Sequence, residues 1–356
     1  MTRIEASSIE AGHPTWSIAA PFFSPGGPNE WVDDHVTDQR WTFRKIPRRE
    51  TRDDWHLRSS RSTGLKAWAG YWEQSRRAFP ASGIITLFPQ LALTASAHKR
   101  LLRRDIPLLA WCFNLGQFPG GWKRAVARAA FKGVDRFVVH STAEIDRVSE
   151  FLDLPPGKVE FVPLQRAPIP IVAGEETDSP FIIAMGSANR DYATFLAAAE
   201  IAKMPCKVVA SPRVTDGLQI PANVSVESGL SPSRCHELVQ KSRLSVVPLL
   251  DPNVASGQVT VIESMRMERA VIATESAGTK DYVRNGTNGV LVPPHDPEAL
   301  ASAMVELWDD DAARRKYARN AATFADEWLS DAAAARALTR IMADLEHQDD
   351  DARKRK

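Results

Sequence analysis

The most constraining feature of this chain is an alternation of short apolar runs with longer helix-like stretches, which stops once and then restarts. Apolar runs separated in this way are typical of parallel sheets whose two faces are both covered by helices. The interruption lies at residues 168–180, a stretch that contains three prolines and that we interpret as an interdomain linker. A chain of 356 residues is also long enough for two domains.

The alternation predicts specific elements on each side of the linker. Before it we expect strands at 16–22, 41–46, 83–88, 106–112, 136–140 and 159–162, and helices at 63–77, 92–104, 122–131 and 142–152. After it we expect strands at 181–185, 206–210, 224–227, 244–250, 271–274 and 289–292, and helices at 191–203, 232–242, 259–267, 297–308, 311–328 and 331–346. This order indicates an α/β fold of two Rossmann-like domains facing a cleft, with a ligand at the carboxyl ends of the strands.

The strongest local signal follows the apolar run at 244–250. Ser256, Gly257 and Gln258 open a helix there, and the free N–H groups of a first helical turn suit an anion such as a diphosphate. Glu263 lies one to two turns further on, where a carboxylate can accept both hydroxyls of a ribose. A capped core helix with one exposed glutamate explains the same spacing and stays open.

Two glycine turns give weaker signals of the same kind. Gly186 follows a strand, and Arg190 stands close enough in sequence to neutralise a bound phosphate. Gly26 and Gly27 follow the first strand and allow a close approach of the backbone to a ligand. Plain structural turns remain an alternative at both places.

Three segments together make the pattern recognisable. Residues 256–264, 270–279 and 285–297 resemble the C-terminal half of family 4 retaining glycosyltransferases, and the resemblance extends over about 180–325. It is weaker over 1–170, where residues 138–144 and 159–164 look like the end of that family's first domain. The family has two Rossmann-like domains, the GT-B fold, and its last helix crosses back to the first domain. The resemblance therefore implies an acceptor-binding domain at 1–170, a nucleotide-sugar-binding domain at 171–325, a returning helix at 326–346 and a charged tail at 347–356.

The resemblance also implies roles for individual residues. Glu263 matches the ribose-binding glutamate of the family, and Gly186 matches the glycine of its phosphate turn. The remaining donor-site candidates lie in the phosphate turn, in the turn beside the nucleotide base and at the opening of the helix: Ser187, Arg190, Gly229, Leu230, Ser256, Gly257, Gln258, Val259 and Thr260. Gly26 and Gly27 match the first-domain glycine loop, which serves the acceptor and the diphosphate.

The sequence departs from the family at three positions. Ala255 occupies the place of a glutamate that contacts the donor sugar, and Ser187 follows Gly186 where an arginine is common, so that Arg190 is the nearest cation. Asn114 stands where the first domain often has a histidine. Asn114 and Arg190 are therefore the candidates for catalysis, and we interpret the chain as a transferase with retained nucleotide binding and a changed sugar pocket. An inactive relative is the alternative.

Charge and composition suggest the partners. Residues 1–170 contain 24 Lys and Arg against 17 Asp and Glu, whereas the remainder contains 21 against 27. The basic residues of the first part gather at 98–104 and 121–132, where Trp122 and Phe131 form an apolar face. Such a helix either contacts an anionic membrane or packs on its sheet with solvated cations. The acceptor is expected to be a glycan or a lipid-linked sugar, in polysaccharide, lipopolysaccharide or glycolipid biosynthesis, and no nucleic-acid motif accompanies the charge.

Further expectations concern metals, cofactors and location. The three cysteines lack metal-ligand spacing, so we predict no metal and no cofactor beyond a UDP- or GDP-linked sugar as substrate. No signal peptide and no apolar run of about 18 residues is visible, which predicts a cytoplasmic protein. The basic helices of the first part predict that it associates with the inner face of the membrane. A sugar-nucleotide epimerase and a non-catalytic nucleotide-sugar-binding partner protein are the alternative functions.

Overall fold

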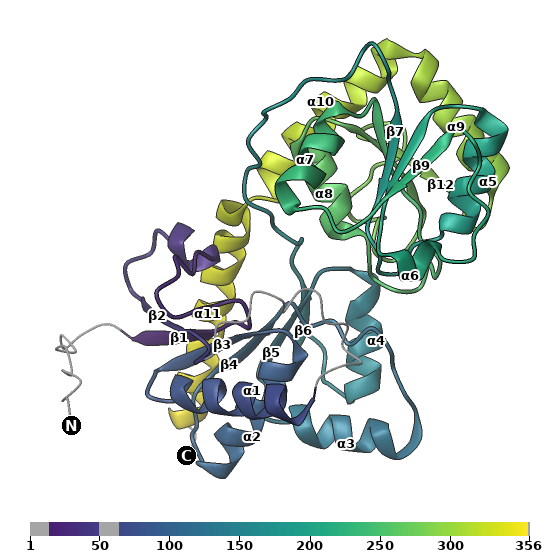
Figure 1. Cartoon of the computed structure of the whole chain (residues 1–356). Helices are drawn as coiled ribbons and strands as arrows, with labels where there is room; N and C mark the ends of the chain where they lie inside the picture. Colours follow the sequence, from purple (N-terminus) through teal and green to yellow (C-terminus); the bar gives the residue numbers. More distant parts are fainter. Residues whose placement is uncertain (1–13, 50–63, 355–356) are drawn as a thin grey trace. The chain divides into compact units, whose positions relative to one another are not determined.

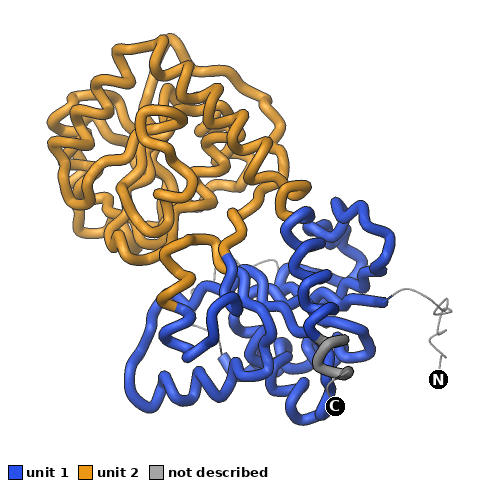
Figure 2. The backbone as a smooth tube through the Cα atoms, turned by 180° about the vertical axis from the view of Figure 1, so that it is seen from behind, with its two compact units in different colours: residues 1–138, 148–160, 335–356 blue, residues 139–147, 161–334 orange. Residues whose placement is uncertain are grey.

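The computed structural model describes residues 14–49 and 64–354. The chain forms two compact units, of which unit 1 contains residues 1–138, 148–160 and 335–356, and unit 2 contains residues 139–147 and 161–334 (Figure 2). Each unit has one six-stranded sheet (Figure 1). Because the last residues return to unit 1, no single position divides the chain into its two units.

Sheet A of unit 1 has the strand order β2-β1-β3-β4-β5-β6. Its strands are β1 (Thr15–Ala19), β2 (Thr42–Ile46), β3 (Gly83–Leu87), β4 (Leu108–Trp111), β5 (Arg136–Val139) and β6 (Val159–Phe161). They are connected by the short helix η1 (Val32–His35) and by α1 (Leu65–Ala78), α2 (Pro89–Leu101), α3 (Gly121–Phe131) and α4 (Ala143–Leu152).

Sheet B of unit 2 has the order β12-β11-β10-β7-β8-β9. Its strands are β7 (Ile182–Met185), β8 (Cys206–Val209), β9 (Val224–Glu227), β10 (Leu244–Val247), β11 (Ala270–Thr274) and β12 (Val290–Val292). The helices of this part of the chain are α5 (Tyr192–Ala202), α6 (Pro212–Thr215), α7 (Pro232–Lys241), α8 (Gln258–Arg266), α9 (Pro297–Asp309) and α10 (Asp311–Trp328). The pairings whose register is described are parallel in both sheets.

Both faces of sheet B are buried, and the strand residues alternate between them. Ile182 and Ala184 of β7 pack with Phe195 of α5 on one face, where α9 also lies. Val271 and Ala273 of β11 pack on the other face, with helices α8 and α10 (Figure 1). Successive side chains of a strand point to opposite faces, so a sheet covered twice requires the continuous apolar runs seen in the sequence.

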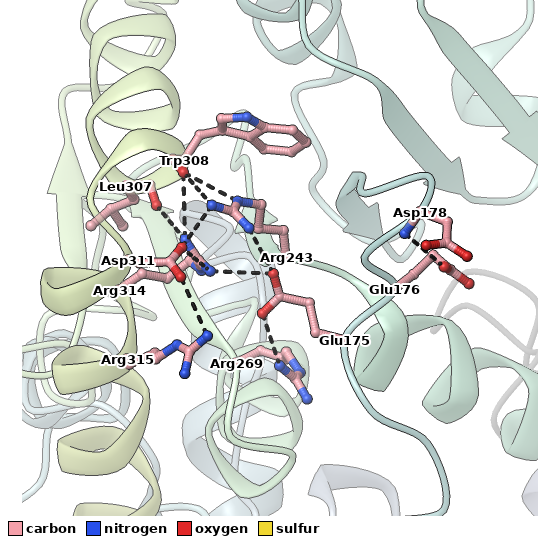
Figure 3. Close-up of polar contacts among 10 residues, drawn as sticks. All are labelled: Glu175, Glu176, Asp178, Arg243, Arg269, Leu307, Trp308, Asp311, Arg314 and Arg315. Atoms are coloured by element: carbon pink, nitrogen blue, oxygen red, sulfur yellow. Dashed lines mark hydrogen bonds and ion pairs between the residues drawn. The ribbon is translucent and has the colours of Figure 1, made fainter.

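The connection between β6 and β7 is held against unit 2 by hydrogen bonds and ion pairs. The buried side chain of Gln240 accepts hydrogen bonds from the N–H groups of Val172 and Ala173, at 2.7 and 2.9 Å, and donates to the carbonyl of Pro170. Further along, the carboxylate of Glu175 contacts three arginines (Figure 3). The proline-rich stretch at 168–180 thus has an irregular backbone but specific partners.

The last helix, α11 (Asp331–Lys354), begins in unit 2 and continues in unit 1. Within unit 1, Glu346 of this helix accepts hydrogen bonds from the indole N–H groups of Trp16 and Trp41, at 3.2 and 2.7 Å. The helix runs on to Lys354, through residues 347–354, which the sequence analysis assigned to a charged tail.

The α/β class with two parallel-sheet halves, predicted from the alternation of elements, is confirmed. The differences are the short helices η1 and α6, which were not predicted, and the ends of several elements. Helix α2 begins at Pro89 rather than at residue 92, because proline fits the first turn of a helix, where its missing N–H needs no partner. The first residue of the helix expected at 63–77 lies outside the described residues, and α1 begins at Leu65.

Candidate functional site

The candidate site lies at the carboxyl edge of sheet B. Because the described pairings are parallel, the loops that follow β7, β10 and β11 leave the sheet at this same edge. Strands β7 and β10 are neighbours in the sheet although two strands separate them in sequence, so the strand order changes direction between them. Open α/β sheets bind ligands at such a switch point, so the loops after β7 and β10 are the candidates for ligand binding.

Helix α8 starts at this switch point without a side-chain cap. Helices α5, α7, α9 and α10 each have an aspartate or serine whose side chain accepts an N–H of the first turn. At the start of α8 the cap position is Gly257, with φ +87° and no side-chain cap hydrogen bond. The N–H groups of Gln258, Val259 and Thr260 therefore have no side-chain acceptor from the cap, and the helix dipole adds partial positive charge there.

The two loops at the switch point are joined by the side chain of Asn189. Its amide nitrogen donates to Ser256 Oγ at 2.8 Å and to the carbonyl of Asp251 at 3.0 Å, while its oxygen accepts the N–H of Asp251 at 2.9 Å. The backbone adds a bridge between Arg190 and Leu249. The turn after β7 and the start of α8 thus form one connected structure.

Gly186 and Arg190 form the turn after β7. Gly186 has φ +109°, and a Cβ atom at this position would lie 2.7 Å from Arg190 Nη2, so the guanidinium lies directly against the glycine. The guanidinium donates to the carbonyls of Met185 and Ala188 and to Thr260 Oγ1, at 3.0, 2.7 and 2.8 Å. Three of the five N–H groups of Arg190 thus brace the turn and α8, and its charge stays beside both. Burial lowers the pKa of this guanidinium, which remains charged at neutral pH.

A further glycine supports this edge from the loop after β11. A Cβ atom on Gly278 would lie 2.0 Å from the carbonyl oxygen and 2.4 Å from the nitrogen of Ser256. These are backbone atoms that cannot rotate away, so only glycine fits. Gly278 belongs to one of the segments that carry the family resemblance, but nothing in its spacing indicated that it touches the start of α8.

Glu263 of α8 is paired within unit 2. Arg166 Nη2 donates to its Oε1, and His236 Nε2 of α7 lies 3.8 Å from its Oε2. The Glu263 side chain keeps 18% of its surface exposed. Neither Arg166 nor His236 carried a motif in the sequence, so reasoning from spacing missed both.

The other predicted donor-site residues lie at the same edge. Ser187 Oγ accepts the N–H of Ser211 at 2.8 Å, from the loop after β8. Gly229, with φ +70°, and Leu230 follow β9 and precede Ser231, which caps α7. Ala255 is buried, and this chain offers no carboxylate at that position.

In unit 1 the predicted residues follow β1 and β4, at the carboxyl edge of sheet A. Gly26 has φ +73°, and a Cβ atom on Gly27 would lie 2.4 Å from Ser24 Oγ. The side chain of Asn29 closes this loop through two hydrogen bonds to the backbone of Ser24. Asn114 is exposed, and its Oδ1 accepts the N–H of Gly116 at 2.8 Å.

Two titratable groups of unit 2 are buried beside the loop after β11. His140 Nδ1 lies 2.7 Å from the carbonyl of Val162, and burial lowers the pKa of this imidazole to about 4. Glu144 is 3% exposed, its Oε2 has no hydrogen-bond partner within the described residues, and burial raises its pKa to about 7. Asp281 of the loop contributes to that rise, and Arg147 opposes it.

Across residues 14–49 and 64–354, no group of three or more His, Cys, Asp or Glu side chains is arranged to hold a metal ion. The helices of the same ranges include none long and apolar enough to cross a bilayer.

Comparisons with known proteins show which sequences and folds the chain is similar to. Residues 210–310 match the family described as glycosyl transferases group 1. Over 64 residues, 18% of the chain, the sequence is 34% identical to an alpha-D-kanosaminyltransferase of Streptomyces kanamyceticus. The matched stretches cover only 17 to 25% of the curated relatives' own lengths.

The similarity to solved structures extends over nearly the whole chain. Sucrose-phosphate synthase from Thermosynechococcus elongatus has a TM-score of 0.69 at 15% identity, covering 94% of this chain and all of the other. Anabaena Alr3699/HepE in complex with UDP-glucose has a TM-score of 0.67 at 13% identity, covering 93% of this chain and all of the other. The chain therefore has the GT-B fold seen in these structures, and residues 210–310 of its second half are similar to the glycosyl transferases group 1 family.

Proposed function

We propose that the protein is a glycosyltransferase, which moves a hexosyl group from a UDP- or GDP-linked sugar to a glycan or lipid-linked acceptor. The transfer proceeds with retention, as the resemblance to family 4 implies, and serves the biosynthesis of polysaccharide, lipopolysaccharide or glycolipid. The observation that carries the proposal is the carboxyl edge of sheet B, where the uncapped start of α8 lies five residues before Glu263 on the same helix.

The residues of this edge suit the parts of a nucleotide sugar. The first-turn N–H groups of α8 and the charge of Arg190 stabilise the diphosphate and the negative charge that grows on it as the sugar leaves. Glu263 accepts the ribose hydroxyls, and the turn at Gly229 and Leu230 lies against the base. Oriented N–H groups and cations can thus do the work for which other transferases use a metal ion, and the leaving phosphate itself can take the acceptor proton.

A transfer assay tests this function. Purified protein is incubated with a panel of UDP- and GDP-sugars and with acceptor glycans or lipid-linked sugars, and the product is followed by mass spectrometry. We expect transfer from one donor class and its loss in Glu263→Ala, with the anomeric configuration of the donor kept in the product and activity unchanged by EDTA. A donor that changes configuration without any acceptor favours an epimerase, and nucleotide-sugar binding without turnover favours the non-catalytic alternative. The comparisons favour neither of these.

We also propose that unit 1 contacts an anionic membrane surface. Leu101, Leu102, Trp122 and Val126 are exposed, and Lys99, Arg100, Arg103 and Arg104 line a hollow beside the first pair. Phe131, expected on the apolar face with Trp122, is buried against Phe113, so this end of the helix packs within unit 1, as the alternative interpretation had it. Exposed apolar side chains beside several cations match a surface that binds anionic lipid.

Vesicle co-sedimentation tests this contact. We expect binding to vesicles containing phosphatidylglycerol and none to pure phosphatidylcholine, with the bound fraction falling in Trp122→Ala. Equal recovery with both vesicle types would contradict the membrane proposal without touching the transfer reaction.

A further inference from the structure

Arg166 occupies a fixed place in the irregular stretch that connects β6 to β7. Its N–H donates to the carbonyl of Leu329 at 3.0 Å. Two residues earlier, the N–H of Leu164 donates to the hydroxyl of Tyr282 at 2.9 Å. The backbone around Arg166 is thus attached to unit 2 at two points, and its side chain starts from a defined position.

The side chain of Arg166 reaches the one carboxylate of the proposed donor site. Nη2 donates to Glu263 Oε1, while the other carboxylate oxygen lies 3.8 Å from His236 Nε2. Three separate elements, the connection, α7 and α8, thus meet at Glu263. The carboxylate is held from one side rather than enclosed.

The contact leaves room for a ligand on the carboxylate. A carboxylate has about four acceptor positions, and a single N–H from Arg166 takes one of them. The side chains of Glu263 and Arg166 remain 18% and 43% exposed. Water screens an ion pair whose arginine is this exposed, so folding alone gives little reason for the contact.

We propose that Arg166 is a positioning residue of the donor site. It fixes Oε1 of Glu263, so that the remaining acceptor positions of the carboxylate take the hydroxyls of a ribose. The inference rests on the proposed function, because it assigns the ligand of Glu263 to the ribose of a nucleoside diphosphate sugar. The new element is that Arg166, which lies outside the residues 210–310 that match the family, increases the selectivity of the site for ribose over 2′-deoxyribose.

The chemistry gives this selectivity a direction. A site that hydrogen-bonds a hydroxyl discriminates against the analogue that lacks it, because its own buried polar group then has no partner. If Arg166 acts only through Glu263, its loss lowers the affinity for the ribonucleotide more than that for the 2′-deoxynucleotide, which offers Glu263 only its 3′-hydroxyl.

The test is calorimetric titration of the full chain with UDP and GDP, followed by the 2′-deoxy form of whichever binds. We expect the wild type to prefer the ribonucleotide by about tenfold, equivalent to one charge-assisted hydrogen bond. Arg166→Ala should reduce the ribonucleotide affinity about five- to tenfold and the 2′-deoxynucleotide affinity only about two- to threefold, because the deoxy form keeps one of the two hydroxyls. Arg166→Lys should restore part of the preference, and Arg315→Ala, which removes an exposed arginine paired with Asp311, should change neither affinity.

Each other outcome has a defined meaning. A Tm of Arg166→Ala within a few degrees of the wild type shows that the variant is folded. Equal losses of affinity for both nucleotides in Arg166→Ala would show that Arg166 contacts the diphosphate. Tighter ribonucleotide binding would show that Arg166 blocks the site, and unchanged affinities would show that the Arg166–Glu263 pair plays no part in binding. Each of these results overturns the proposal. A Glu263→Gln protein that keeps the ribose preference also overturns it, because Glu263 is then not the acceptor. If the wild type binds neither nucleotide, the proposed function itself fails.

Discussion

The two edges of sheet B use the same kinds of charged side chain in opposite ways. At the amino edge, Arg243 and Arg269 immediately precede β10 and β11, and they meet Glu175 together with Arg314 of α10 (Figure 3). Arg243 also donates to Asp311 and to the carbonyl of Trp308, each at 2.7 Å. At the carboxyl edge, Glu263 pairs with Arg166, lies 3.8 Å from His236 Nε2 and keeps part of its surface exposed.

The difference lies in what remains unpaired after folding. The Arg314 guanidinium is almost fully buried and donates to Glu175 and to the carbonyls of Leu307 and Trp308, so the amino edge is a closed network that includes the connecting stretch. At the carboxyl edge the helix start is uncapped and Glu263 has a single arginine partner, although its side chain, at 18% exposed, is as covered as that of Glu175, at 20%. A closed network contributes to stability, whereas an open one keeps groups available for a ligand.

Arg314→Met should have the largest effect on stability and none on binding. Removing the buried Arg314 side chain leaves the carbonyl of Leu307 without this donor and Glu175 with two arginines instead of three, and we expect a loss of about 2–3 kcal/mol in the free energy of unfolding. Urea denaturation measures this, with Arg315→Met as the control for an exposed arginine on the same helix. A large loss of nucleotide affinity in a folded Arg314→Met protein would erase the distinction between the edges.

Gly278→Ala should affect both properties at the carboxyl edge. The added Cβ atom would lie 2.0 Å from the backbone oxygen of Ser256, so the loop or the start of α8 must move. We expect a stability loss of about 2 kcal/mol, as for other overpacked sites, and at least tenfold weaker nucleotide binding. Gly174→Ala, where the added atom meets nothing within 4 Å, is the matched control. Undiminished binding by Gly278→Ala would show that the helix start does not hold the ligand.

Glu144→Gln should be more stable than the wild type above neutral pH, because the buried Glu144 carboxylate beside the loop after β11 destabilises the fold when it is ionised. Burial raises the Glu144 pKa to about 7 from 4.5, so the native state holds this proton more tightly than the unfolded state does. The resulting stabilisation is present below pH 4.5 and is lost as the pH rises through 7. We therefore expect Glu144→Gln to exceed the wild type by about 1–2 kcal/mol at pH 8 and to approach it at pH 5.

The control for this pH dependence is His140, whose shift has the opposite sign. Its pKa falls to about 4 from 6.5 because burial disfavours the charged imidazole, so its contribution is present above pH 6.5 and is lost as the pH falls through 4. Comparing Glu144→Gln with the wild type at each pH cancels the histidine contribution. A constant difference between the two proteins from pH 5 to pH 8 would contradict the assignment to Glu144.

The sequence predicted the sheets well because their signal is local. Continuous apolar runs such as those of β7 and β10 report burial on both faces, and the alanine-rich pattern of α10 gave its ends at Asp311 and Trp328. The contacts of Asn189, Gly278 and Arg166 were not predicted because each joins segments far apart in the chain. Periodicity carries no information on such contacts, whereas glycine at a strand end or helix start does indicate where a ligand can approach.

The central claim is that the carboxyl edge of sheet B binds a nucleotide through Glu263. The most direct measurement is calorimetric titration of UDP and GDP into the wild type and Glu263→Gln, which keeps the side-chain shape and removes the charge. We predict that one nucleotide binds the wild type and that its affinity falls at least tenfold in Glu263→Gln, with an unchanged Tm in the absence of ligand. Equal affinity in the two proteins would contradict the account.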